Sequence, residues 1–338
     1  MLCLPDHWTW DFWIADTGTE FHVFFLRASR ALHDPERRHR RASIGHAVST
    51  DLRSWTVLAD AVVTSDGPAF DDLATWTGSV VRDPGGGWRM FYTGVAREDD
   101  GLRQRIGAAV SEDLAVWHKD AETPVLDPDP AYYETLGRSS WQDQAWRDPW
   151  VYQDPDGDGW HMLVTARSLD GAAHDRGVVG HARSTDLLHW SVQPPLSGNA
   201  GFGQLEVLQF HRVEGRGVVV FSCLHAELGE ERAASGTTGG VWTVPCEDPR
   251  AGVDVGSATL LTDDRLYAGR LVDDRDGRTM LLAFHHTAAD GDFAGGLSDP
   301  IPVEWDGEGN LRTVGEPLVG RRVDSHHDQL PTKENCDV

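Results

Sequence analysis

Three acidic residues stand in surroundings that are unusual for solvated carboxylates. Asp11 lies in the segment HWTWDFWIAD, where Trp8, Trp10 and Trp13 flank it. Glu206 is an isolated acid in the apolar run GFGQLEVLQF. Burial costs an ionised carboxylate, so such an acid must be hydrogen-bonded or must serve a function. Burial also favours the protonated form of a carboxyl group, which suits Glu206 to the role of a general acid.

The third acid, Asp148, occurs in WQDQAWRDPWVYQD, where the following Pro149 limits ladder pairing, as suits an innermost or irregular strand. Arg147 beside it points to the opposite face if the backbone is extended. The segment W-T-G-S at 76–79 offers hydroxyls and an aromatic face to a sugar. Structural alternatives stay open: a turn at Arg-Asp-Pro, a strand start at 76–79, and a water-facing edge strand for Glu206.

An internal repeat dominates the organisation of the chain. Residues 45–55 (GHAVSTDLRSW), 107–117 (GAAVSEDLAVW) and 180–190 (GHARSTDLLHW) share the form G-x-A-x-S-[TE]-D-L-x-x-W. Two looser copies follow, one beginning at Gly239 and one ending at Trp305. Repetition at a roughly constant interval of about 60 residues indicates a solenoid, a propeller or an array.

Local patterns choose among these architectures. A β-rich, roughly alternating run precedes each repeat, after a cluster of Gly and Asp typical of a turn; the runs are 21–28, 88–95, 160–167, 217–224 and 279–286. Short strands and tight turns predict four-stranded antiparallel blades. Five such units predict an all-β, five-bladed propeller around an axial pocket, which keeps the sheet edges short and protected.

The acids of the repeat itself are interpreted as structural. In each copy the Asp-Leu pair suits a turn and the Trp packs at the outer edge of the blade, so Asp51, Asp113 and Asp186 are not expected to be catalytic. Residues 1–320 are predicted to form one propeller domain. Residues 321–338 are polar and lack a core pattern, which predicts a short C-terminal tail.

Charge and composition narrow the classes of partner. Thirty Lys and Arg against 54 Asp and Glu give a net charge of −24, which disfavours nucleic-acid and membrane partners. No apolar run is long enough to span a bilayer and no leader segment precedes the fold, so we expect a cytoplasmic protein, or a secreted one if a leader was removed. The expected partner is a small molecule or an oligosaccharide, bound by a monomer or a weak homo-oligomer.

No cofactor or metal site is expected. Cys3, Cys223, Cys246 and Cys336 are scattered without zinc spacing and are expected to be free thiols. The segment DPDGDG at 154–159 begins like a calcium loop, but Thr165 stands where the loop needs Glu, which favours a hairpin turn. The adjacent His pairs at 285–286 and 326–327 point to opposite faces of a strand and do not share a metal.

The ordered motifs identify a family. WTWDFW at 8–13, W-T-G-S at 76–79, W-R-D-P at 146–149 and the following Glu206 occur in this order, on different blades. Together they resemble the catalytic motifs of glycoside hydrolase families 32 and 68, the β-fructosidases, invertases and levansucrases that share a five-bladed propeller. The resemblance extends from Trp8 to about Leu311.

The resemblance implies a role for each acid. Asp11 would be the nucleophile that forms a fructosyl-enzyme intermediate, Asp148 the transition-state stabiliser, and Glu206 the acid/base. A retaining glycosidase uses one ionised and one protonated carboxyl group across the scissile bond. The residues expected to bind substrate are Trp10, Trp13, Trp76, Ser79, Arg147 and Tyr267.

The sequence also departs from the family patterns. The nucleophile segment is W-D-F-W and not Asn-Asp-Pro, and Val207 replaces the usual Cys after the acid. The sequence has no counterpart of the C-terminal β-sandwich of family 32, and the long loops of family 68 are shortened. The leading hypothesis is a retaining, exo-acting β-fructofuranosidase or fructosyltransferase. An inverting arabinofuranosidase or xylosidase of the family 43 type and a non-catalytic carbohydrate-binding propeller are the alternatives.

Overall fold

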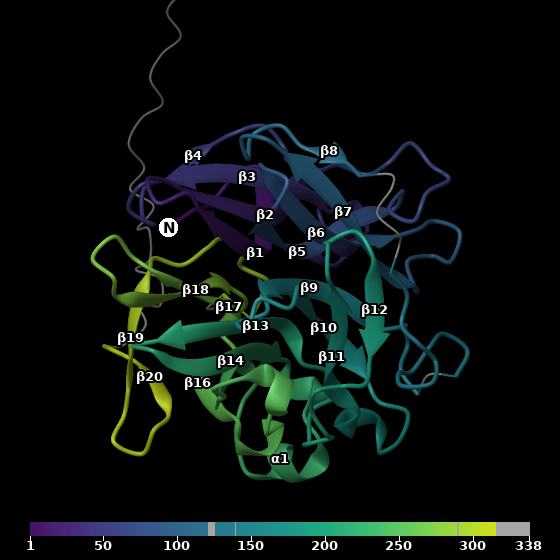
Figure 1. Ribbon diagram of the computed structural model, residues 1–338, viewed down its shortest axis with the longest axis vertical. Coiled ribbons are helices and arrows are strands. Elements are labelled where there is room, and N and C mark those ends of the chain that lie inside the picture. Colours follow the sequence, from purple (N-terminus) through teal and green to yellow (C-terminus); the bar gives the residue numbers. More distant parts are fainter. Residues whose placement is uncertain (121–125, 139, 289–290, 316–338) are drawn as a thin grey trace, which may run out of the picture.

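Five four-stranded antiparallel sheets surround a central axis in the computed structural model (Figure 1). The structure describes residues 1–120, 126–138, 140–288 and 291–315. The first strand of each sheet, β1, β5, β9, β13 or β17, lies nearest the centre in Figure 1, and the later strands follow outward. The predicted all-β, five-bladed propeller is confirmed.

Each blade consists of four consecutive strands. Blade one comprises β1 (His7–Asp16), β2 (Phe21–Ser29), β3 (Ser43–Ser49) and β4 (Thr56–Val57). Blade two comprises β5 (Ala74–Arg82), β6 (Trp88–Val95), β7 (Gln104–Ser111) and β8 (His118–Lys119). Blade three comprises β9 (Trp146–Gln153), β10 (Trp160–Arg167), β11 (Gly177–Ser184) and β12 (Trp190–Gln193). Blade four comprises β13 (Glu206–Val213), β14 (Arg216–Cys223), β15 (Gly240–Pro245) and β16 (Thr259–Asp263). Blade five comprises β17 (Leu266–Asp273), β18 (Thr279–His285), β19 (Ile301–Trp305) and β20 (Leu311–Thr313).

Short helices lie in the connections between strands. They are the 3-10 turns η1 (Arg30–Leu32), η2 (Pro35–Arg41), η3 (Ala173–Asp175), η4 (His225–Glu227), η5 (Pro249–Ala251) and η6 (Val255–Ser257), and the single-turn helix α1 (Glu230–Ala234). None of the helices within the described ranges is long and apolar enough to cross a membrane.

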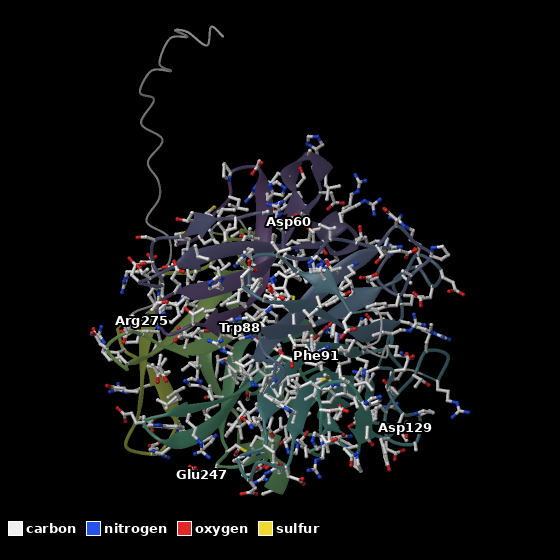
Figure 2. All side chains as sticks on the ribbon, turned by 45° about the horizontal axis from the view of Figure 1, so that its top comes forward. Asp60, Trp88, Phe91, Asp129, Glu247 and Arg275 are labelled. Atoms are coloured by element: carbon white, nitrogen blue, oxygen red, sulfur yellow. The ribbon has the colours of Figure 1, made fainter. Side chains whose placement is uncertain are left out.

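The second strand of each blade is largely buried. Every residue of β6 (WRMFYTGV) and of β10 (WHMLVTAR) is buried, because each blade packs against a neighbour on both faces. Figure 2 shows Phe91 inside the molecule and Glu247 at its periphery. The ring closes where blade five meets the N-terminal segment, with Leu2 bridged to Leu297 and the Gly296 N–H bonded to the Thr9 carbonyl at 2.8 Å.

A β-bulge interrupts the first strand of every blade near its N-terminal end. In each case one extra residue enters the inner strand, within the segments 10–12, 76–78, 147–150, 206–209 and 267–270. A bulge redirects side chains and is frequent beside active sites. Asp148, Val207 and Ala268 adopt the left-handed region there, with φ of 59°, 54° and 51°. This conformation is costly for a non-glycine residue, and most of all for a β-branched one such as Val207.

Hydrogen bonds from the preceding blade hold these bulges. Thr93 Oγ1 of blade two accepts from the Asp148 N–H at 3.0 Å, and Ser222 Oγ of blade four accepts from the Ala268 N–H at 3.0 Å. Asp148 Oδ2 itself accepts from the Val207 N–H at 3.2 Å. Because a buried N–H needs a partner, these bonds between blades stabilise a backbone that the local sequence alone disfavours.

The repeat motif forms the same turn three times. Asp51, Asp113 and Asp186 each accept two backbone N–H bonds, from the second and third residues after the Asp. The leucine that follows each Asp has a φ between 61° and 67°. The indole N–H groups of Trp117 and Trp190 bond back to the carbonyls of these leucines. The predicted turn role of the three Asp residues is confirmed.

Several further predictions concern the C-terminal residues, the cysteines and the segment 154–159. The predicted domain end at 320, the tail 321–338, Cys336 and the His pair 326–327 lie outside the described residues. The strands described run from His7 to Thr313, and the boundary at 320 stays a proposal. The remaining three cysteines are free. Residues 154–159 connect β9 to β10, as expected for a hairpin turn.

Candidate active site

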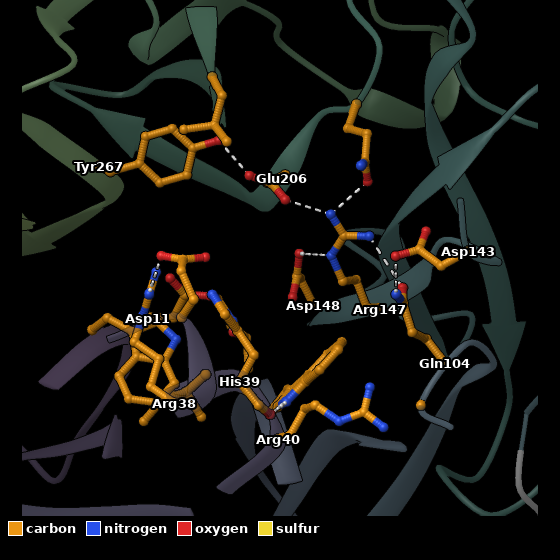
Figure 3. Close-up of a pocket in the computed structure, with 18 of the residues that line it drawn as sticks. Asp11, Arg38, His39, Arg40, Gln104, Asp143, Arg147, Asp148, Glu206 and Tyr267 are labelled. Carbon is orange, nitrogen blue, oxygen red and sulfur yellow. Dashed lines mark hydrogen bonds and ion pairs between the residues drawn. The ribbon is translucent and has the colours of Figure 1, made fainter. Parts of the chain in front are cut away.

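A cavity of about 630 Å³ opens at the end of the axis where the inner strands begin. All three predicted acids, Asp11, Asp148 and Glu206, line it, although they come from blades one, three and four. Figure 3 shows Asp11, Asp148 and Glu206 around this common space. The bulges account for this convergence, because they lie at the level of the pocket in every blade.

Asp11 is the extra residue of the bulge in β1. Thr77 of the neighbouring blade donates a hydrogen bond from Oγ1 to Asp11 Oδ2 at 2.6 Å. Burial and then the negative charge of Asp148 raise the pKa of Asp11 to about 7, against the lowering effect of the Thr77 bond. The charges of Glu206 and Arg270 act on Asp11 as well, which places it in one electrostatic cluster with the other two acids.

Asp148 is the most deeply enclosed of the three acids, with 2% of its surface exposed. Its Oδ2 accepts from Thr165 Oγ1 at 2.8 Å and lies 3.4 Å from Arg147 Nε. Burial raises the pKa of Asp148, while the Arg147 charge opposes the rise. Its fixed bonds suit a group that keeps its position and does not react.

Glu206 is held from both sides by its neighbours. The Arg147 guanidinium bonds to Glu206 Oε1, and the Tyr267 hydroxyl donates to Oε2 (Figure 3). Arg147 also bonds to Gln204 Oε1 and, at 3.1 Å, to Gln104 Oε1. Two donors on separate carboxyl oxygens fix the direction of Glu206 in the pocket.

Comparison with known proteins decides the family. The family model described as "Glycosyl hydrolases family 32 N-terminal domain" matches residues 14–292. The chain belongs to glycosyl hydrolase family 32. The resemblance inferred from the ordered motifs is therefore confirmed at the level of the family.

Several curated relatives of this family 32 chain are plant proteins. It is 30% identical over 203 residues to "Beta-fructofuranosidase, insoluble isoenzyme CWINV6" of Arabidopsis thaliana, a match that covers 57% of this chain and 33% of that protein. It is 35% identical over 176 residues to "Fructan 1-exohydrolase w1" of Triticum aestivum, covering 50% of this chain and 26% of that protein. The matches thus span a third or less of these curated relatives.

Solved structures share the fold. The inulosucrase from Halalkalicoccus jeotgali bound to kestose superposes with a TM-score of 0.74 at 22% identity, over 97% of this chain and 92% of that chain. The Bombyx mori GH32 beta-fructofuranosidase BmSUC1 gives a TM-score of 0.68 at 19% identity, over 93% and 64% of the two chains. At these identities the likeness concerns the propeller fold alone.

Four of the six residues predicted to bind substrate line the pocket of the family 32 chain. They are Trp10, Trp76, Arg147 and Tyr267. Arg147 does so against the expectation that it faces away from Asp148. That expectation assumed an extended backbone and is wrong, because the bulge and the φ of 59° at Asp148 turn both side chains toward the pocket.

Trp13 and Ser79 do not reach the pocket. Trp13 has no exposed surface and stacks on Phe24, with ring centroids 6.1 Å apart, so it belongs to the core. Ser79 is 1% exposed, and its Oγ accepts from the Val151 N–H at 3.0 Å, which joins blades two and three. Their positions therefore give no support to the prediction that these two residues bind substrate. The hydroxyl of the W-T-G-S segment that serves the site is that of Thr77.

Sequence reasoning missed Glu227 of η4, which also lines the pocket. Gln204 Nε2 lies 3.5 Å from its Oε1, and burial followed by the charge of Glu206 raises the pKa of Glu227 to about 8. No motif marks this residue, because it lies in an irregular connection of blade four. Thr77, by contrast, lies within the W-T-G-S motif at 76–79.

The 3-10 turn η2 forms one wall of the pocket through Arg38 and His39. The Arg38 guanidinium lies 3.8 Å from the ring centre of Phe293 and 5.6 Å from that of Trp10. Trp76 donates its indole N–H to the His39 carbonyl at 2.7 Å, which fixes the aromatic wall. Burial, then the Arg38 charge, lowers the pKa of His39 to about 3, so its ring is neutral near pH 7.

Proposed function

We propose that this protein is a retaining, exo-acting β-fructofuranosidase, with fructosyl transfer to an acceptor as a competing outcome. One observation carries the proposal: Asp11, Asp148 and Glu206 line one axial cavity, each with a different set of partners. Membership of family 32 supports it and disfavours the family 43 alternative. The names of the curated relatives, a β-fructofuranosidase and a fructan 1-exohydrolase, point to fructosides as substrates.

The partners of each acid support a double displacement. Asp11, ionised, attacks the anomeric carbon of a fructosyl unit, while Glu206 protonates the glycosidic oxygen and the bond to the leaving group breaks. In the second step Glu206 takes a proton from water, whose oxygen displaces Asp11 from the same carbon. The second inversion restores the original anomeric configuration.

Asp148 and Arg147 are assigned to supporting roles. Asp148 accepts bonds from Thr165 and from the Val207 N–H, so its carboxylate stays in place beside the positive charge that develops on the sugar ring. Arg147 and Tyr267 hold the Glu206 carboxyl group toward the leaving oxygen. Exo action follows if the sugar enters a pocket at one end of the axis, because only a terminal unit fits a pocket.

The test is a substrate panel with product identification. Sucrose, 1-kestose, inulin, levan and an aryl arabinofuranoside are incubated with the wild-type protein, and NMR follows the anomer that is released first. We expect fructose to appear first as the β-anomer, together with transfer products at high sucrose concentration. Release of the α-anomer, or cleavage of the arabinofuranoside alone, would contradict the proposal.

A variant separates catalysis from mere binding. Asp11→Ala is assayed on every substrate that the wild type cleaves. Loss of turnover on all of them supports the nucleophile assignment, whereas unchanged turnover refutes it. A wild-type protein that binds these sugars without cleaving any of them favours the non-catalytic alternative.

A further inference from the structure

Arg270 is a buried cation behind the wall of the pocket. It follows the bulge of β17 in blade five and is 1% exposed. Its Nε donates to the Phe12 carbonyl at 3.2 Å, and its Nη1 donates to the carbonyls of Val207 at 3.2 Å and Leu208 at 2.6 Å. One side chain therefore bonds to the inner strands of two other blades.

The bonded carbonyls belong to the bulges that carry the acids. Phe12 directly follows Asp11, and Val207 directly follows Glu206. Val207 is also the β-branched residue with a φ of 54°. The Arg270 guanidinium thus fixes the backbone next to Asp11 and the backbone next to Glu206 relative to each other.

Arg270 forms no ion pair with a carboxylate in the part of the chain that the structure describes. No carboxylate of the described residues lies within 4.0 Å of it, and its Nη2 has no hydrogen-bond partner among them. The guanidinium carbon lies 4.9 Å from the ring centre of Trp150. Burying a cation without a paired anion is costly. The negative groups that act on it are Asp148 first and Asp11 second, and burial lowers the pKa of Arg270 to about 10 in spite of them.

We propose that Arg270 is a positioning residue of this site, whose guanidinium links the strand of Asp11 to the strand of Glu206 and supplies the buried positive charge that Asp11 and Asp148 face. The expected effect of Arg270 on turnover rests on the proposed function. The expected effect of Arg270 on the ionisation of Asp11 can be measured without any substrate.

The sign of that effect follows from the charges around Asp11. Asp148 on β9 and Glu206 on β13 disfavour its ionised form, whereas Arg270 on β17 and the Thr77 hydrogen bond from β5 favour it. Arg38 on η2 adds a further positive charge near Asp11. Without the Arg270 charge, less positive charge offsets the negative charges of Asp148 and Glu206. The pKa of Asp11 should therefore rise.

Two substitutions separate charge from geometry. Arg270→Gln keeps hydrogen-bond donors but removes the charge, and Arg270→Lys keeps the charge but cannot bond to both strands in the same way. The control is Arg89→Gln, because Arg89 is also buried, with 6% of its surface exposed, yet pairs with Asp83 and Asp120 and does not line the pocket. Each variant is assayed for kcat and KM on the best substrate, and the Asp11 carboxyl carbon is titrated by NMR after labelling, with Asp11→Asn giving the assignment.

We expect Arg270→Gln to raise the titration midpoint of Asp11 by about one pH unit, the size of a lost neighbouring charge. We expect both Arg270 variants to lower kcat by about tenfold or more with little change in KM, as for groups that act in the transition state. Arg270→Lys keeps the wild-type midpoint, and Arg89→Gln changes neither quantity.

The outcomes are distinguishable. If Arg270→Gln does not fold, Arg270→Lys still decides through kcat, and an unchanged kcat there overturns the positioning role. Folded Arg270 variants with the wild-type midpoint and the wild-type kcat overturn the whole inference. If the wild type cleaves no fructoside, the proposed function fails, and the titration alone decides the inference about Arg270.

Discussion

Aspartate occupies two contrasting regions of this propeller. In the outer turns, Asp51 accepts backbone bonds from Ser54 and Arg53, which hold the pKa of its carboxyl group at about 2. At the axis, burial and the charge of Asp148 raise the pKa of Asp11 to about 7. The same side chain is thus ionised throughout the neutral range at the rim, whereas in the pocket it titrates near pH 7.

The difference lies in the donors and the solvent around each carboxyl group. The rim carboxylates receive two backbone N–H bonds each and stay in contact with water. Asp11 receives a hydrogen bond from Thr77 and lines a cavity that several other acids also line, Asp148 and Glu206 among them. The repeated motif therefore marks carboxylates that form turns of the blades, whereas the three acids that we propose as catalytic lie outside the repeat.

The largest expected effect comes from Asp11→Asn, which removes the nucleophile but nearly preserves the shape of the side chain. We expect kcat to fall by a factor on the order of 10⁴. Asp51→Asn is the control in the outer region and should leave kcat unchanged. If kcat fell equally in Asp11→Asn and Asp51→Asn, the proposed difference between the pocket and the outer turns would be contradicted.

Glu206→Gln is expected to lower kcat on sucrose by roughly 10²–10⁴-fold, because the leaving oxygen no longer receives a proton. An aryl fructoside needs less proton donation, so its cleavage should suffer much less in the first step. Glu214→Gln, at an exposed turn of the same blade, serves as the control. A loss that is independent of the leaving group would argue against the acid role.

The third prediction concerns pH. Because Asp11 must be ionised to attack and its pKa is raised to about 7, kcat/KM should fall as the pH drops through that value. Thr77→Val removes the bond that favours the ionised form, so the acid limb should move upward by about one unit. Ser79→Ala, in the same segment but outside the pocket, should not move it. An unmoved limb in Thr77→Val would show that another group controls the profile.

The smallest effect is expected at the rim. Asp51→Ala loses the bonds from the Arg53 and Ser54 N–H groups, which are solvent-exposed, so the free energy of unfolding at pH 7 should fall by only about 0.5–1 kcal/mol. The folded-state pKa is lowered, so this stability is present above the unfolded value and is lost as the pH falls toward 2. Urea unfolding should show that the difference in the free energy of unfolding between the wild type and Asp51→Ala is smaller at low pH than at pH 7. A difference that grows in acid would contradict the assignment.

The sequence predicted the architecture because the repeat is carried by local chemistry. Turn residues and alternating strands recur in each blade, and each copy specifies its own hairpins without reference to the others. The three acids were identified through their order along the chain. This order is sufficient in a propeller, since equivalent positions of successive blades meet at the axis.

The side-chain directions at the site could not be predicted in the same way. The bulge at Asp148 depends on Thr93 of another blade, and it reverses the expected direction of Arg147. Thr77 and Ser79 are two positions apart in one motif, yet the bulge at 76–78 directs only the first to Asp11. Contacts between blades decide these details, and no local pattern encodes them.

The covalent step offers the most direct test of the account. The Glu206→Gln variant is mixed with an aryl fructoside, quenched rapidly and digested, and the peptides are analysed by mass spectrometry. We predict one fructosyl unit on the peptide that contains Asp11, because the second step needs Glu206 to activate water. Turnover without any adduct, or an adduct on a different residue, would contradict the assignment of Asp11 as the nucleophile.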